Sequence, residues 1–101
     1  MRVIAKKALI DFWSQPEHRD SEIPLRAWHE TAERASWSQF SDVKESHRHS
    51  YFAGGNRVIC DFGDRGDRLV AAIGYKSGFV EIKFVGTIEE YSAIDAATVE
   101  L

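Results

Sequence analysis

Apolar residues recur with the period of an α-helix in the N-terminal part of the chain. One stripe predicts a helix that ends before Pro16, and its buried side consists of Ala5, Ala8, Leu9, Phe12 and Trp13. A second stripe predicts a helix with Pro24 in its first turn and Asp20 or Ser21 as its cap; its buried side consists of Leu25, Trp28, Ala32 and Ala35. Residues 41–45 can form one more helical turn, and residues 1–4 a short strand.

The period changes from 3.6 to 2 in the second half of the chain. Residues 56–62, 68–75 and 79–85 alternate between apolar and polar positions, and this pattern predicts three consecutive strands. We expect tight hairpin turns at Arg65-Gly66 and Ser77-Gly78, where glycine supplies a positive φ. The order of elements predicts an α+β fold, with N-terminal helices on one face of a three- to four-stranded antiparallel sheet and a short C-terminal helix.

The alternation assigns each strand residue to one of two faces. The face covered by the helices is expected to carry Val58, Cys60, Phe62, Leu69, Ala71, Ile73, Tyr75, Val80, Ile82 and Phe84. The open face is expected to carry Arg57, Ile59, Asp61, Arg68, Val70, Ala72, Gly74, Glu81, Lys83 and Val85. Two-residue turns would pair Gly74 with both Arg57 and Glu81, and Ala72 with both Ile59 and Lys83.

This register predicts a shallow groove on the open face. Its floor is formed by the small residues of the middle strand, and Arg57 stands opposite Glu81 and Lys83. Two cations beside a small floor can seat a phosphodiester, whereas the alternative is that they are merely solvated. We expect both cationic side chains to be exposed.

Composition limits the classes of function. The 101 residues suffice for one domain, and the apolar fraction of 44% is that of an ordinary globular protein. No apolar run reaches the ~20 residues that cross a bilayer, no signal-peptide core is present, and Cys60 has no partner for a disulfide, so we expect a cytoplasmic protein. The formal net charge is −3, which means that any nucleic-acid site must be a local patch.

Residues 47–85 supply such a patch, with six cations, namely Arg48, Arg57, Arg65, Arg68, Lys76 and Lys83, against four carboxylates. His47 and His49 can add titratable groups near the open face, or they can be surface residues without a function. No cysteine pair or His-Glu-x-x-His motif accompanies them, so we expect no metal site. Tyr91 can exchange a proton with a nearby phosphate or can pack the last helix onto the sheet.

The end of the chain resembles a known family. Ile82-Lys83-Phe84-Val85-Gly86-Thr87 followed by Glu90-Tyr91 and Ile94-Asp95 is similar to the C-terminal signature of the HigB toxins, which are small RelE-like mRNA interferases. Thr87 is expected to cap a short helix there. Earlier segments resemble the same family in the same order: Arg2-Val3-Ile4-Ala5-Lys6, Phe12-Trp13, Pro24-Leu25-Arg26-Ala27-Trp28, Asn56-Arg57-Val58-Ile59 and Arg68-Leu69-Val70.

The resemblance implies a single RelE/HigB-like domain over residues 1–101 that cleaves mRNA on the ribosome without a cofactor or metal. Its implied partners are the ribosome, mRNA and a HigA-type helix-turn-helix antitoxin that neutralises it, and no membrane. Carried over by position, Arg68, Lys83 and Tyr91 would be catalytic, and the RNA-binding residues would be Arg48, Arg57, Lys76, His47 and His49.

Two positions depart from the family pattern. Lys83 stands where an arginine is more usual, which loses the bidentate fork, and Ile88 stands where a histidine usually follows Gly-Thr. The alternative to an active toxin is therefore a catalytically weakened or inactive HigB-like protein that serves as an antitoxin-binding or RNA-binding module.

Overall fold

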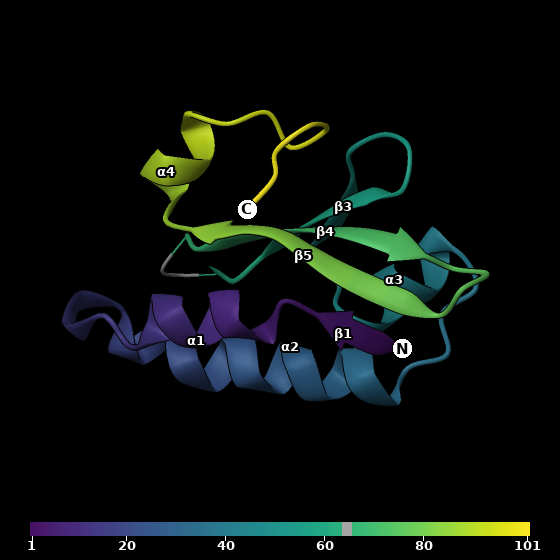
Figure 1. The fold of residues 1–101 in the computed structure, drawn as a ribbon, viewed down its shortest axis with the longest axis horizontal. Helices are drawn as coiled ribbons and strands as arrows, with labels where there is room; N and C mark the ends of the chain where they lie inside the picture. The colour runs from purple at the N-terminus through teal and green to yellow at the C-terminus, as the bar shows by residue number, and fades with distance from the viewer. Residues whose placement is uncertain (64–65) are drawn as a thin grey trace.

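The fold is a central sheet with helices on one side and the C-terminal part of the chain on the other (Figure 1). The structure is a computed structural model that describes residues 1–63 and 66–101. In chain order the elements are β1 Arg2–Ile4, α1 Lys6–Trp13, the 3₁₀ helix η1 Pro16–Ser21, α2 Glu22–Arg34, α3 Phe40–Ser46, β2 Ser50–Phe52, β3 Arg57–Asp61, β4 Arg68–Gly74, β5 Phe79–Gly86 and α4 Ile88–Ser92. No helix among the described residues is long and apolar enough to span a bilayer.

The sheet differs from the predicted three- to four-stranded antiparallel one. It has five strands in the order β1-β5-β4-β3-β2, and β1 pairs with β5 in parallel. A parallel pair needs a long crossover connection, and here the helices and the other strands separate β1 from β5. The edge strand β2 is only three residues long, which is too short to show an alternating pattern.

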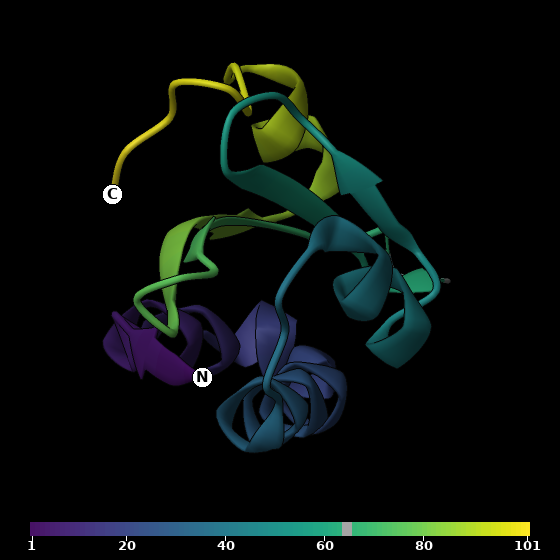
Figure 2. The same cartoon turned by 90° about the vertical axis from the view of Figure 1, so that its right-hand side faces the viewer.

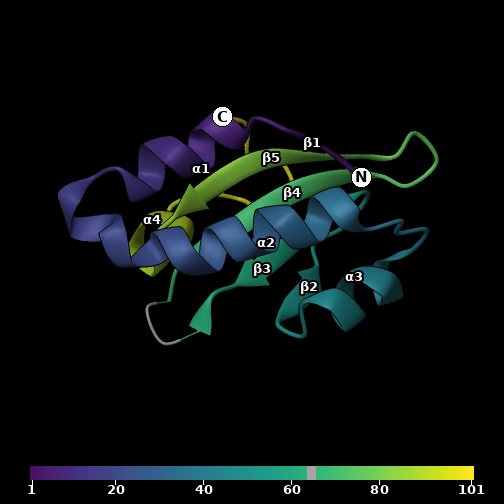
Figure 3. The same cartoon turned by 90° about the horizontal axis from the view of Figure 1, so that it is seen from below.

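The hydrophobic core lies between the sheet and the helices α1 and α2, which run beneath it, with α3 under the β2 edge (Figure 3). Leu9 and Leu25 from the helices and Leu69 and Ile82 from the sheet are fully buried. Truncation of such a leucine to alanine typically costs about 2–5 kcal/mol in the free energy of unfolding. The predicted helix face is confirmed at most positions, since Val58, Cys60, Leu69, Ala71, Ile73, Val80 and Ile82 are all buried in this core.

Two assignments near the end of β5 are wrong. Phe84 is opposite Val70 and Val85 is opposite Leu69, so Phe84 lies on the open face and Val85 packs against the core. The cause is an irregularity in the β4–β5 ladder at Val70/Ala71, where Lys83 is an extra residue on β5. A β-bulge of this kind reverses the alternation for every residue that follows it.

The predicted registers are also displaced by two residues. Between β3 and β4, Arg57 is opposite Ala72. Between β4 and β5, Gly74 is opposite Phe79, because the turn spans residues 75–78 instead of Ser77-Gly78 alone. A shift by two residues preserves the face of each side chain, which is why the other face assignments survive. Of the predicted Arg65-Gly66 turn, Arg65 lies outside the described residues.

Ser21, one of the two caps predicted for the second helix, does not cap it. No side chain caps α2 at Ser21, because η1 runs directly into α2. The Ser21 hydroxyl instead donates a buried hydrogen bond of 2.5 Å to Oδ2 of Asp67, which ties the start of α2 to the residue before β4.

Candidate functional site: the upper face of the sheet

The face of the sheet away from α1 and α2 is the predicted open face, and we call it the upper face. It is covered by α4 and by residues 93–101, which we call the C-terminal segment (Figure 2). Gly86 lets α4 approach closely, since a Cβ atom there would lie 2.7 Å from the Phe84 ring and 3.0 Å from Glu90 Oε1. Thr87 caps α4 as predicted: its hydroxyl accepts from the Glu90 N–H, and the Glu90 carboxylate accepts from the Thr87 N–H. The open face is therefore not empty.

The first cluster on this face, which we call the anion site, joins Arg57, Lys83 and Glu100. The carboxylate of Glu100 lies between the two cations, with Oε2 2.7 Å from Arg57 Nη2 and Oε1 2.7 Å from Lys83 Nζ. Arg57 Nη1 also donates to the carbonyl oxygens of Val99 at 2.7 Å and Ala96 at 3.3 Å. The structure thus brings together the two cations that the sequence placed on opposite sides of a groove.

Charge pairing within the anion site shifts the pKa values of Lys83 and Glu100. The hydrogen bond to Glu100 raises the pKa of Lys83 above its usual range, and the same bond lowers the pKa of Glu100. Glu81 adds a second carboxylate 3.3 Å from Lys83 Nζ. The side chains of Arg57 and Lys83 are only 11% and 14% exposed, so the prediction that both are exposed is wrong; the C-terminal segment covers them.

The second cluster, which we call the aromatic end, lies where β4 begins and β5 ends. Arg68 Nη1 donates to Oδ1 of Asp61 at 3.0 Å and to the carbonyl oxygens of Gly66 at 2.9 Å and Asp67 at 3.3 Å. The guanidinium carbon of Arg68 lies 6.0 Å from the centre of the Tyr91 ring, within cation–π range.

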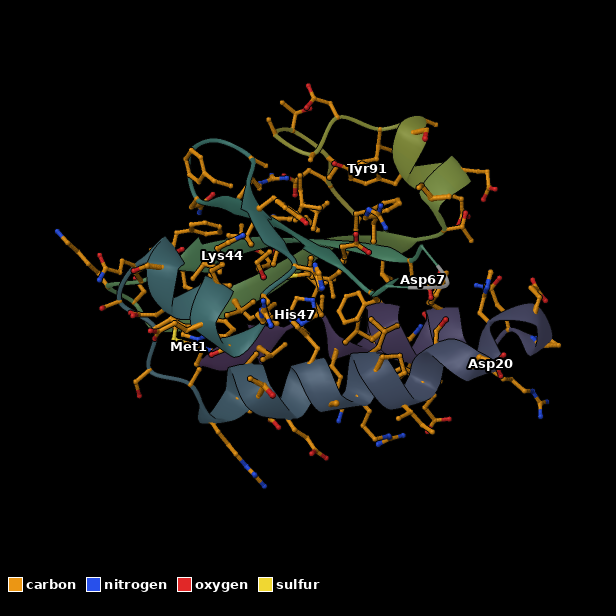
Figure 4. The ribbon with its side chains drawn as sticks, turned by 180° about the vertical axis from the view of Figure 1, so that it is seen from behind. Met1, Asp20, Lys44, His47, Asp67 and Tyr91 are labelled. Carbon is orange, nitrogen blue, oxygen red and sulfur yellow. The ribbon has the colours of Figure 1, made fainter. Side chains whose placement is uncertain are left out.

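Tyr91 extends from α4 over the sheet at the aromatic end (Figure 4). Its ring centre lies 6.3 Å from that of Phe84, which reached this face through the β-bulge. Ile88 begins α4 and is 44% exposed; a Cβ atom added at Gly66 would meet its side chain at 3.6 Å. Ile88 is therefore next to Gly66, whose carbonyl oxygen accepts from Arg68.

The remaining predicted RNA-binding residues lie off the upper face, although His47 contacts the backbone of Asp61. His47 lies between the sheet and α2, where Nε2 is 2.9 Å from the Asp61 carbonyl oxygen and the ring contacts Phe62 (Figure 4). Arg48 and His49 line a hollow against α3, and Lys76 is exposed in the β4–β5 turn. The structure does not bring these four residues to the upper face.

Sequence reasoning missed Glu100 and the role of Asp61 as the partner of Arg68. Strand parity placed Asp61 and Arg68 on the same face, but the predicted register put Asp61 opposite Val70, whereas it lies directly opposite Arg68. Glu100 has no such signal, since it lies in a segment without helix or strand and 17 residues from Lys83. No group of three or more His, Cys, Asp or Glu side chains that could hold a metal occurs within residues 1–63 and 66–101.

Comparison with known proteins identifies the family. No curated protein matches the chain. The sequence model of HigB_toxin, described as the RelE-like toxic component of a toxin-antitoxin system, matches residues 21–94. This range covers well over half of the 101 residues and includes α2 to α4, and with them both clusters except the C-terminal segment. The chain therefore belongs to the HigB family of RelE-like toxins, and an antitoxin is its implied partner.

Proposed function

We propose that this protein is an mRNA endonuclease that acts in the cytoplasm on the translating ribosome and is neutralised by a HigA-type helix-turn-helix antitoxin. The observation that carries the proposal is the anion site: Arg57 and Lys83 hold one carboxylate from two sides at 2.7 Å each. An RNA backbone also presents anionic oxygens, one phosphate after another, so the same two cations suit it.

The cations of the upper face are far enough apart to contact more than one phosphate. Arg68 pairs with Gly86, three residues beyond Lys83 on β5, which separates the two backbone positions by about 10 Å along the strand. We place the scissile phosphate between Lys83 and Arg68, where both long side chains reach it, and the neighbouring phosphate at Arg57. The two cations then stabilise the charge that develops on the phosphorane.

The reaction needs no group beyond RNA and side chains that lie on this face. The 2′-hydroxyl attacks the adjacent phosphorus; the O2′–P bond forms and the P–O5′ bond breaks, which leaves a 2′,3′-cyclic phosphate and a 5′-hydroxyl. Glu81, next to Lys83, accepts the 2′ proton, and Tyr91, next to Arg68, donates a proton to O5′. The base and the acid then flank the scissile bond from opposite sides.

The net charge of −3 supports a dependence on the ribosome. Affinity for free RNA comes mostly from the neutralisation of phosphates by Lys and Arg, and an acidic protein with a local cationic patch has little of it. The ribosome would hold the mRNA in place, so that the upper face needs to contact only a few nucleotides.

A second candidate function is a module that binds the antitoxin or RNA without cleavage. Ile88 favours it, because an isoleucine at the start of α4 provides no ionisable group beside Arg68. This candidate and the first share every binding partner, and they differ only in whether mRNA is cut.

Expression in cells without the antitoxin tests the proposal. We expect growth arrest and transcripts truncated at codon boundaries, and co-expression of a HigA-type antitoxin should restore growth. Normal growth with intact transcripts, at confirmed expression of folded protein, would contradict the proposal and favour the module that only binds.

A further inference from the structure

The C-terminal segment occupies the RNA-binding part of the upper face in the manner of a ligand. It follows α4 and folds back over the sheet through a turn at Asp95, whose carbonyl oxygen accepts from the N–H groups of Thr98 at 3.1 Å and Val99 at 2.8 Å. It contains no lysine or arginine, and it carries the acidic residues Asp95 and Glu100.

In its contacts with Arg57 and Lys83, the segment supplies oxygen atoms as the hydrogen-bond acceptors. Arg57 donates to the carbonyl oxygens of Ala96 and Val99 and to the Glu100 carboxylate, and Lys83 donates to the other Glu100 oxygen. An RNA backbone also presents acceptor oxygens and negative charge. The segment therefore offers these two cations the same chemistry as RNA.

The segment and an RNA phosphate cannot occupy the anion site together. With the segment in place, Arg57 and Lys83 are 11% and 14% exposed, which leaves little of either cation for a further anion. Lys83 already faces two carboxylates, Glu81 at 3.3 Å and Glu100 at 2.7 Å, and these would repel a phosphate.

The contact is also of a kind that can be exchanged. The Glu100 side chain is 60% exposed, and ion pairs with an exposed partner add little to stability because water and salt screen them. The segment has no helix or strand of its own that would have to unfold before it leaves.

We propose that the C-terminal segment is an autoinhibitory competitor of RNA, in which the two Glu100 carboxylate oxygens take the places of RNA phosphate oxygens at Arg57 and Lys83. The proposal rests on the proposed function, since RNA is the ligand that displaces the segment. In the docked state Lys83 is held on Glu100, away from the scissile phosphate, and release of the segment frees both cations. The apparent affinity for RNA is then the intrinsic affinity multiplied by the fraction of molecules in which the segment is undocked.

The first test measures the affinity for a short 2′-O-methyl oligoribonucleotide, which cannot be cleaved, by fluorescence anisotropy. Glu100→Gln keeps the shape of the side chain and removes its charge. If the segment is docked about nine-tenths of the time, this variant binds about tenfold more tightly than the unaltered protein. Glu89→Gln is the matched control, because it removes the same charge from exposed α4 and should change the affinity less than twofold.

The second measurement follows the segment itself. The amide resonances of Val99 and Glu100 should move toward random-coil positions when the unaltered protein is saturated with the oligonucleotide. Unchanged resonances, an equal or weaker affinity of Glu100→Gln, an equal gain in Glu89→Gln, or no binding by any form would each overturn the proposal. These outcomes differ from failure of the proposed function, in which Glu100→Gln binds RNA more tightly but no form cleaves ribosome-bound mRNA.

Discussion

The two ends of the upper face hold their cations in different ways. At the anion site, Arg57 and Lys83 bind a residue far away in the sequence, in a segment without regular structure. At the aromatic end, Arg68 binds the strand opposite and its own loop through Asp61, Gly66 and Asp67, under the ring of Tyr91. The first set of contacts can exchange with a ligand, whereas the second is part of the folded scaffold.

This difference separates binding from positioning. A cation that stabilises a transition state works best when its orientation is fixed before the substrate arrives, and Arg68 meets this condition. A cation that captures a flexible RNA backbone can be covered until the ligand displaces its cover, as at Arg57. We therefore expect substitutions at the aromatic end to change mainly the rate of cleavage, and substitutions at the anion site to change RNA binding as well.

The largest effect is expected for Arg68. Arg68→Ala should lower the rate of cleavage of ribosome-bound mRNA by about 30- to 1000-fold, because a fixed contact to the transition state is lost. Arg68→Lys keeps the charge without the planar fork, and its cleavage rate should lie between those of the unaltered protein and Arg68→Ala. The exposed Arg34 on α2 supplies the control, and Arg34→Ala should cleave normally. Full activity of folded Arg68→Ala would show that the aromatic end takes no part in cleavage.

At Arg57, the expected change is in binding. Arg57→Ala should weaken RNA affinity about three- to tenfold, less than the full contact is worth because the same substitution also releases the C-terminal segment. The slope of log Kd against log salt should decrease by about 1, as expected when one phosphate contact is lost. Anisotropy titrations at several salt concentrations measure both quantities. An unchanged slope would mean that no phosphate is bound at this residue.

Ile88→His tests whether proton transfer at the aromatic end limits the rate of cleavage. An imidazole at the start of α4, beside the loop that binds Arg68, should raise the cleavage rate about tenfold if proton transfer limits the reaction. If the imidazole acts as a base, the gain in rate should be largest at a pH above its pKa. If it acts as an acid, the gain should be largest at a pH below its pKa. Ile88→Gln is the polar control without a titratable group, and an equal gain in both variants would argue against proton transfer.

The smallest effect concerns the opposite face, which the helices cover permanently. Burial raises the pKa of the Cys60 thiol from 9.0 to about 11, so the folded state keeps a proton that the unfolded state loses. This contribution to stability is complete below pH 9 and is lost as the pH rises toward about 11. Iodoacetamide at pH 8 should leave Cys60 unmodified both in the unaltered protein and in Glu100→Gln. Rapid labelling of either would show that the helix face also opens.

The sequence predicted the faces of the sheet better than its edges. Alternation identified the core-facing residues of β3, β4 and the first part of β5, because residues on one face of a strand recur with a period of two. It did not indicate that Val70 and Ala72, on the opposite face of β4, are buried as well. It failed at Phe84 and Val85, since a β-bulge inserts a residue without any local sign in the composition. The parallel pairing of β1 depends on contacts between distant segments, which periodicity does not contain, and β2 is too short to show a period.

The candidate site was predictable to a similar extent. Strand parity brought Arg57 and Lys83 to one face, and the structure joins them through a single carboxylate. The position of Glu100 follows from the path of the chain after α4, which no pattern in residues 93–101 reveals. The exposure of both cations was overestimated for the same reason, since their cover comes from this segment.

Cleavage of mRNA by purified components tests the central claim most directly. The measurement is the rate at which purified ribosomes carrying a defined mRNA yield truncated product, with the unaltered protein and with Lys83→Ala. We predict cleavage within the ribosome-bound codon by the unaltered protein and a rate about 30- to 1000-fold lower for Lys83→Ala. Lys7→Ala, at an exposed position on α1, should leave the rate unchanged. Intact mRNA with the unaltered protein, or equal cleavage by folded Lys83→Ala, would contradict the assignment of the upper face as an RNA-cleaving site.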